Sequence, residues 1–195
     1  MKTKVLLTLA LSAVLSLTSF SQEKEKRFGF ELSGGPSMAT RELDQSNLKP
    51  GFGFEGIFHY RILSHTGVYA GWGWNWMSSE NAIASNNSDF EETGYVLGLQ
   101  FKHPIDGFRT SYYLRAGALY NHIEIENDNG DIIGDTGHKP GFQLATGIDI
   151  PLGKKWSLTP GIKYNAISGK TDISGESFSI DYHYLSVRIG ILAKF

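Results

Sequence analysis

The sequence predicts an all-β protein, an eight-stranded antiparallel up-and-down β-barrel that crosses a membrane. Three observations predict it. Apolar and polar residues alternate with a period of two along most of the chain after its first 21 residues, as in strands with two different faces. Long polar connections alternate with tight turns, which is typical of membrane barrels. The sequence also ends on an alternating strand at Phe195, and closure of a barrel gives such a strand a partner on each side.

The N-terminal segment precedes the predicted barrel. Residues 1–21 have a basic start and an apolar stretch of 13 residues, followed by small residues before Gln22, which predicts a cleaved signal peptide. An uncleaved anchor helix is the alternative, but the apolar run is shorter than the ~20 residues that span a bilayer. We therefore expect a signal peptide at residues 1–21 and one barrel domain at residues 22–195.

The first half of the barrel domain contains four predicted strands. They run over about 27–35, 51–62, 67–77 and 91–102. In the third strand Trp72, Trp74 and Trp76 alternate with glycine and asparagine, so the three indoles share one face. Long polar connections follow the first and third strands, and a tight turn follows the second; these cover 36–50, 78–90 and 63–66.

The second half repeats the same arrangement. Its four strands cover about 109–125, 141–150, 155–167 and the segment from 180 to the end. Tight turns rich in proline, glycine and polar residues mark the short connections. The short connections are 103–108 and 151–154, and the long ones are 126–140 and 168–179. The even count places both ends of the barrel domain on the short-turn side.

Composition excludes several classes of protein. There is no cysteine, hence no disulfide and no thiolate metal site. Without the two lysines of the signal peptide, 16 basic residues face 20 acidic ones, which argues against a nucleic-acid-binding surface. Glycine makes up 23 of 195 residues. Glycines on the polar face of so many strands favour a crowded interior, because on a solvent-exposed face they would only weaken the sheet.

The apolar face could look toward lipid or toward the core of a soluble, lipocalin-like barrel. Aromatic side chains gather on that face near both strand ends, as in the aromatic belts of membrane barrels, and this favours lipid. At the short-turn rim these are Tyr60, Phe101, Tyr112, Trp156 and Phe195; at the long-loop rim they are Phe52, Trp74, Trp76, Tyr120, Phe142 and Tyr164.

The opposite face carries isolated charges between glycines. The seven are Glu31, Glu55, Arg61, Arg115, Asp149, Lys163 and Arg188. An eight-stranded barrel has an interior just wide enough for side chains to fill it. We therefore expect these charges to form an ion-pair network that plugs the lumen, with a narrow solute path as the alternative.

With these features the chain resembles the small outer-membrane β-barrel proteins of Gram-negative bacteria, the OmpA/OmpX/OmpW-like "porin family". The resemblance covers the whole barrel domain and implies the cell outer membrane, its lipid and lipopolysaccharide, and the barrel-assembly machinery as partners. In that family the last strand is the assembly signal, here Val187, Ile189, Ile191, Ala193 and Phe195. No peptidoglycan-binding domain follows the barrel in this sequence, unlike in full-length OmpA-type proteins.

The sequence predicts no catalytic residue, cofactor or metal. Its six histidines form no HExxH or HxxxH spacing. The acidic segment 126–135 departs from the calcium-loop spacing, so a solvated loop is expected there. Lipid A deacylases of this barrel type use a His-x-Ser pair, whereas His183 and Ser186 are separated by two residues and fall on opposite faces of a strand.

The sequence is compatible with three functions. The first is a structural or surface-interaction barrel with a plugged lumen. The second is a minor pore for small or apolar solutes, which the OmpW resemblance implies. The third is a lipid A-modifying enzyme. The sequence identifies no external ligand.

Overall fold

The computed structural model describes residues 26–41, 48–83, 86–173 and 176–195; the predicted signal peptide, residues 1–21, lies outside them. Within these ranges the regular elements are strands, and no helix is long and apolar enough to span a membrane. The strands are β1 (Phe28–Ala39), β2 (Gly51–Arg61), β3 (Thr66–Ile83), β4 (Asn86–Pro104), β5 (Ser111–Asn127), β6 (Ile132–Asp135), β7 (Lys139–Pro151), β8 (Trp156–Leu158), β9 (Gly161–Ile173) and β10 (Glu176–Lys194).

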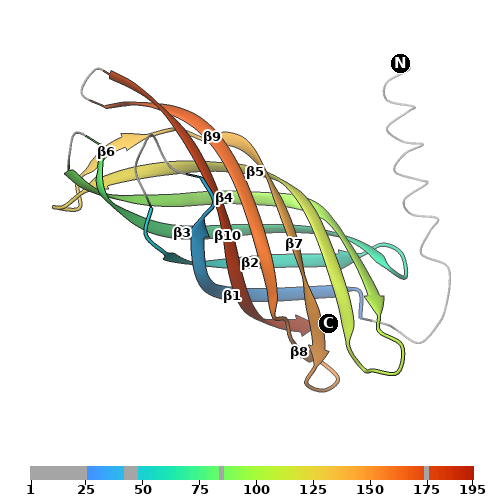
Figure 1. Cartoon of the computed structure of the whole chain (residues 1–195). Helices are drawn as coiled ribbons and strands as arrows, with labels where there is room; N and C mark the ends of the chain where they lie inside the picture. The colour runs from blue at the N-terminus through green and yellow to red at the C-terminus, as the bar shows by residue number, and fades with distance from the viewer. Residues whose placement is uncertain (1–25, 42–47, 84–85, 174–175) are drawn as a thin grey trace, which may run out of the picture.

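The strands form one closed antiparallel barrel whose wall is eight strands around (Figure 1). The short β6 and β7 count as one strand of this wall, because both pair with β5. In the same way β8 and β9 count as one strand of the wall, because both pair with β10. The predicted eight-stranded antiparallel barrel is therefore confirmed.

The first and last strands meet along a seam. Pairing between β1 and β10 runs from Gly29↔Lys194 to Ala39↔Tyr184. At its end the Phe28 N–H donates to the Phe195 carbonyl (3.1 Å), and the Phe195 N–H donates to the Phe28 carbonyl (2.9 Å). The two phenyl rings stack with centroids 6.2 Å apart. The C-terminal residue is thus part of the closure that the sequence predicts.

The seventh predicted strand is interrupted. Strand β8 ends at Leu158 and β9 begins at Gly161, because Pro160 has no N–H to donate to a neighbour. Pairing nevertheless continues through the break: the Thr159 N–H donates to the Gly190 carbonyl (2.8 Å), and the Ile148 N–H donates to the Pro160 carbonyl (2.9 Å).

Three of the four predicted long polar loops, 78–90, 126–140 and 168–179, contain much β-structure, so that part of the prediction was wrong. Strands β3 and β4 pair almost to their connection, with Ile83 opposite Asn86. Strands β9 and β10 pair as far as Ile173 opposite Glu176, and β6 forms a hairpin with the end of β5. We call this side of the barrel the long-hairpin end and the side with the tight turns the short-turn end.

The polarity of the two barrel faces reverses along the strands. Around the middle of β4, Leu97 and Leu99 point outward and are 66% and 60% exposed. Toward the long-hairpin end Phe90 and Ile125 are fully buried inside, while Glu91, next to Phe90, is on the outer face. The reversal begins just beyond Tyr120 on β5, which points outward and is 58% exposed. An apolar outer band therefore ends near Tyr120, and the hairpins beyond it have the polarity of a water-soluble protein.

Candidate functional site

The lumen is the candidate site, because it gathers nearly all of the charged residues that the sequence singled out. Six of the seven predicted lumen charges are buried inside the barrel: Glu31, Glu55, Arg115, Asp149, Lys163 and Arg188. The seventh, Arg61, ends β2 and is only half-buried at the short-turn end. The structure thus gathers six of them in the interior and places the last at the opening.

A bidentate ion pair joins β1 and β5 across the lumen. Arg115 Nη1 donates to Glu31 Oε1 (3.1 Å), and Nη2 donates to Glu31 Oε2 (2.5 Å). His59 Nε2 lies 3.4 Å from the same carboxylate. The guanidinium also stacks over Tyr113, 4.3 Å from the ring centroid. The planar guanidinium group of Arg115 thus donates two hydrogen bonds to one carboxylate, and this geometry fixes both side chains.

A second layer is centred on Glu55 of β2. Lys163 Nζ and Gln143 Nε2 both donate to Glu55 Oε1, at 3.0 and 2.7 Å. The Tyr69 hydroxyl donates to Gln143 Oε1 (3.2 Å). Arg188 donates from Nη2 to Ser186 Oγ (3.3 Å), while its Nε and Nη1 are buried without a partner. Arg188 therefore lies in the lumen without a direct ion pair to Glu55.

The third layer lies near the short-turn end and was only partly predicted. Asp149 is 2% exposed and binds two lysines, Lys102 and Lys194. Lys194 also donates to Ser157 Oγ (2.7 Å). Both lysines occupy lumen-facing positions in the period of two. The signal was therefore present in the sequence, but these lysines were not singled out.

The fourth layer lies toward the long-hairpin end and is centred on Glu92, a residue that the sequence pattern does not single out. This carboxylate is 2% exposed and accepts hydrogen bonds from the Asn121 and Asn165 amides. Asn165 donates further to the Tyr184 hydroxyl (2.8 Å). Beyond this layer the large buried side chains are mostly apolar. The buried cluster there includes Met77, Phe90, Ile123, Ile125, Ile167 and Ile180.

Lumen glycines allow tyrosine rings to lie across the barrel. A Cβ on Gly117 would lie 2.5 Å from the Tyr69 hydroxyl, and one on Gly147 would lie 2.4 Å from the Tyr113 hydroxyl. A Cβ on Gly53 would lie 2.8 Å from Arg188 Nη2. The glycines thus make room for aromatic rings as well as for the cations expected from the sequence.

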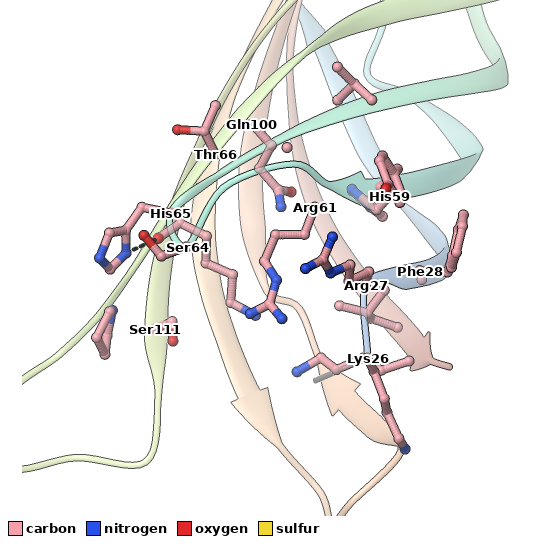
Figure 2. A pocket seen from close by; sticks show the side chains of 18 residues that line it. Lys26, Arg27, Phe28, His59, Arg61, Ser64, His65, Thr66, Gln100 and Ser111 are labelled. Atoms are coloured by element: carbon pink, nitrogen blue, oxygen red, sulfur yellow. Dashed lines mark hydrogen bonds between the residues drawn. The ribbon is translucent and has the colours of Figure 1, made fainter. Parts of the chain in front are cut away.

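A cavity of about 660 Å³ opens at the short-turn end. Figure 2 shows Arg27 and Arg61 reaching toward the same space below His59 and Gln100. The pKa of Lys26, which precedes β1, is lowered by desolvation and by the cations of Lys155, Lys194 and Lys154. Five basic residues line this opening: Lys26, Arg27, Arg61, Lys102 and Lys194.

The aromatic residues assigned to the belts lie on the outer face. At the short-turn rim Trp156 is 54% exposed, and at the opposite rim Phe52 is 50% exposed. The Trp74 indole N–H donates to Glu91 Oε2 (3.1 Å), so this ring meets the polar zone beyond the apolar band. The other outer-face residues of this set are Tyr60, Phe101, Tyr112 and Phe195 at the short-turn rim, and Trp76, Tyr120, Phe142 and Tyr164 at the opposite rim.

The last strand presents its apolar side to the outside. Val187, Ile189 and Ile191 are all substantially exposed on the outer face, and so is Phe195 at the end of the seam. These residues of the expected assembly signal are therefore accessible to lipid or to another protein.

The structure keeps His183 and Ser186 apart. His183 accepts or donates a hydrogen bond with the Tyr164 hydroxyl (3.1 Å) on the outer face. Ser186 points inward, where its hydroxyl lies 2.7 Å from that of Ser37. The two residues therefore lie on opposite faces, as expected.

A cluster of His122, Glu124 and Asp135 on the outer face could ligate a metal ion.

Comparisons with known proteins identify the same architecture. The model of the outer membrane protein β-barrel domain family matches residues 7–190. The Neisserial surface protein A is similar in structure with a TM-score of 0.65, at 16% identity, over 89% of this chain and 100% of that one. No curated protein matches the sequence.

Two further solved barrels are similar in fold. OprG from Pseudomonas aeruginosa gives a TM-score of 0.59 at 15% identity, over 88% of this chain and 97% of that one. Ail of Yersinia pestis gives 0.51 at 15% identity, over 89% and 100%.

Proposed function

Because this chain belongs to the outer membrane protein β-barrel domain family, we propose that it has a structural or surface-interaction role in the outer membrane, with a lumen closed by its own side chains. Its location in the outer membrane follows from the family. The role and the closure are our proposal.

The observation that carries the proposal is the filling of the lumen. Polar layers centred on Asp149, Glu31, Glu55 and Glu92 follow one another along the barrel, and their charged groups are buried and bonded. An apolar cluster follows them at the long-hairpin end. Charges inside a membrane protein need partners or water, and here most of them have partners. This arrangement supports a plug rather than an aqueous path.

The long-hairpin end is the surface that we assign to the cell exterior. Outer-membrane barrels have short periplasmic turns and longer extracellular loops, and the paired hairpins here project beyond the apolar band. We expect outer-leaflet lipid and lipopolysaccharide around Tyr120 and Phe142. We also expect the barrel-assembly machinery to bind the outward face of β10 through Val187, Ile189 and Phe195.

The charge of the hairpins limits the kind of external partner. Ail was crystallised with a heparin analogue, sucrose octasulfate, which is a polyanion. On this chain the outer face of β4 and β5 beyond the apolar band carries acidic residues, namely Asp89, Glu91, Glu124 and Glu126. These would repel a sulfated ligand. If the surface binds a partner at these strands, we expect a cationic one.

A minor pore is the second candidate function, and the short-turn cavity favours it. Its five basic residues, of which Lys102 and Lys194 already bind Asp149, would attract anionic solutes to this opening. The layers above it, beginning with Asp149 and Glu31, oppose passage. The third hypothesis, a lipid A-modifying enzyme, has no support from the placement of His183 and Ser186.

Cysteine labelling tests the assigned orientation, because the natural chain has no cysteine. Asn129 lies in the exposed turn between β5 and β6, and Lys154 lies in the exposed turn before β8. We expect a membrane-impermeant maleimide to label Asn129→Cys on intact cells, and to label Lys154→Cys only after lysis. The reverse pattern would refute the orientation, and recovery of the protein in the soluble periplasmic fraction would refute membrane insertion.

A further inference from the structure

Three potential metal ligands meet on the outer face just beyond the apolar band. His122 and Glu124 are two residues apart on β5 and therefore share a face, and Glu124 pairs directly with Asp135 of β6. His122 Nδ1 lies 3.7 Å from Glu124 Oε1 and 3.4 Å from Asp135 Oδ1. The three ligand atoms all lie within 4.8 Å of one another.

The surrounding strands concentrate negative charge at this place. Glu124 is directly opposite Glu91 on β4, and Glu126 is directly opposite Asp89. Like charges directly opposite each other destabilise a sheet. The outer face of β4, β5 and β6 therefore carries carboxylates whose mutual repulsion a bound cation would relieve.

A second imidazole lies beside the first. The His138 ring stacks on the His122 ring with centroids 4.7 Å apart and planes inclined by 15°, and it also lies close to the Tyr120 ring, with centroids 5.0 Å apart. The Gly137 N–H donates to Asp135 Oδ1 (2.7 Å). This bond holds the carboxylate in place, as outer-shell hydrogen bonds do for metal ligands.

We propose that His122, Glu124 and Asp135 form a binding site for a divalent transition-metal ion of the Zn²⁺ type. A tetrahedral Zn²⁺ with bonds of about 2.0–2.1 Å separates its ligand atoms by about 3.4 Å. The His122–Asp135 separation already has this value, and small side-chain rotations bring Glu124 into place. The fourth position is filled by water or, after a rotation, by His138.

The donor set determines the class of ion. An imidazole nitrogen with two carboxylates suits zinc and its first-row neighbours, whereas the hard cations Ca²⁺ and Mg²⁺ prefer oxygen ligands. The site lies on the outer surface beyond the apolar band. The inference therefore does not depend on whether the lumen is closed or on which partner the barrel binds.

Calorimetry with Zn²⁺ and the full chain in detergent micelles tests the site. We expect one ion per chain, and binding at least about tenfold weaker in His122→Asn and in Asp135→Asn. The matched control is the double variant His65→Asn/His103→Asn. These rings are also 4.7 Å apart, but they lie at the short-turn end, and we expect the control to bind Zn²⁺ like the natural chain.

Cobalt provides a spectroscopic readout of direct ligation. Co²⁺ bound by protein ligands in a tetrahedral site gives strong visible absorption, which we expect for the natural chain and the control and not for His122→Asn. The slower gel migration of boiled samples confirms that each variant is folded. The proposal is overturned if the folded natural chain binds no Zn²⁺ at 100-fold molar excess, if His122→Asn binds with unchanged affinity, or if the control loses binding.

Discussion

Replacing Arg115 by methionine tests whether the lumen layers stabilise the barrel as bonded pairs. The substitution removes both hydrogen bonds to Glu31, a carboxylate that is 2% exposed. Removing one partner of a buried ion pair costs about 3–5 kcal/mol. His59 stays close to Glu31 and compensates in part. We therefore expect a loss of about 3 kcal/mol, which is roughly 100-fold in the folding equilibrium.

A second variant separates the loss of the pair from the loss of packing. Glu31→Gln/Arg115→Met removes both charges, so no unpaired carboxylate remains, and we expect it to recover most of the lost stability. The control is Arg41→Met. Arg41 and Asp181 form an ion pair at 3.6 Å with exposed side chains, and such a pair contributes less than about 1 kcal/mol.

Urea unfolding in phospholipid micelles, followed by tryptophan fluorescence, measures these free energies of unfolding. Three outcomes would refute the reasoning. The first is an Arg115→Met variant within about 1 kcal/mol of the natural chain, since buried pairs cost more than that to break. The second is a double variant as unstable as the single one. The third is an equal loss in Arg41→Met.

Three other predictions concern the glycines, the hairpins and the seam. Gly117→Leu places atoms where the Tyr69 hydroxyl lies and should cost at least about 1–3 kcal/mol in the same assay; an unchanged stability would contradict the close approach. Ile125→Ala removes most of a fully buried side chain and should lower the free energy of unfolding by about 2–5 kcal/mol, whereas the same substitution in a solvated loop would leave it almost unchanged. Deleting Phe195 removes the last hydrogen bonds of the seam and should reduce outer-membrane insertion, measured by cell fractionation, more than secretion; normal barrel yield would argue against an assembly signal.

The sequence predicted the barrel because its period of two reflects a local property, the alternation of side chains about each strand. It failed at the hairpins for a physical reason. Beyond Tyr120 large apolar residues enter the inner face and acidic residues line the outer face of β4 and β5, so Phe90 beside Glu91 no longer fits the pattern of a lipid-facing strand. Polar residues such as Asp89 and Glu126 then suggest a solvated loop, although backbone pairing continues between them.

The candidate sites were predictable only in part. The period of two places Arg115 and Glu31 in the lumen, but their pairing joins residues 84 positions apart and depends on the register of every strand between them. The metal cluster depends on register in the same way, because His122 and Asp135 are 13 positions apart on different strands. No ligand spacing in the sequence marks such a site.

Single-channel recording of the full chain in planar lipid bilayers tests the closed lumen most directly. Eight strands leave an interior that side chains fill, whereas aqueous channels need about 16 strands. With the layers around Asp149, Glu31, Glu55 and Glu92 in place, we predict no sustained conductance from protein that is folded by its gel migration. Steady, ohmic conductance from the same folded protein would contradict the account and favour the pore.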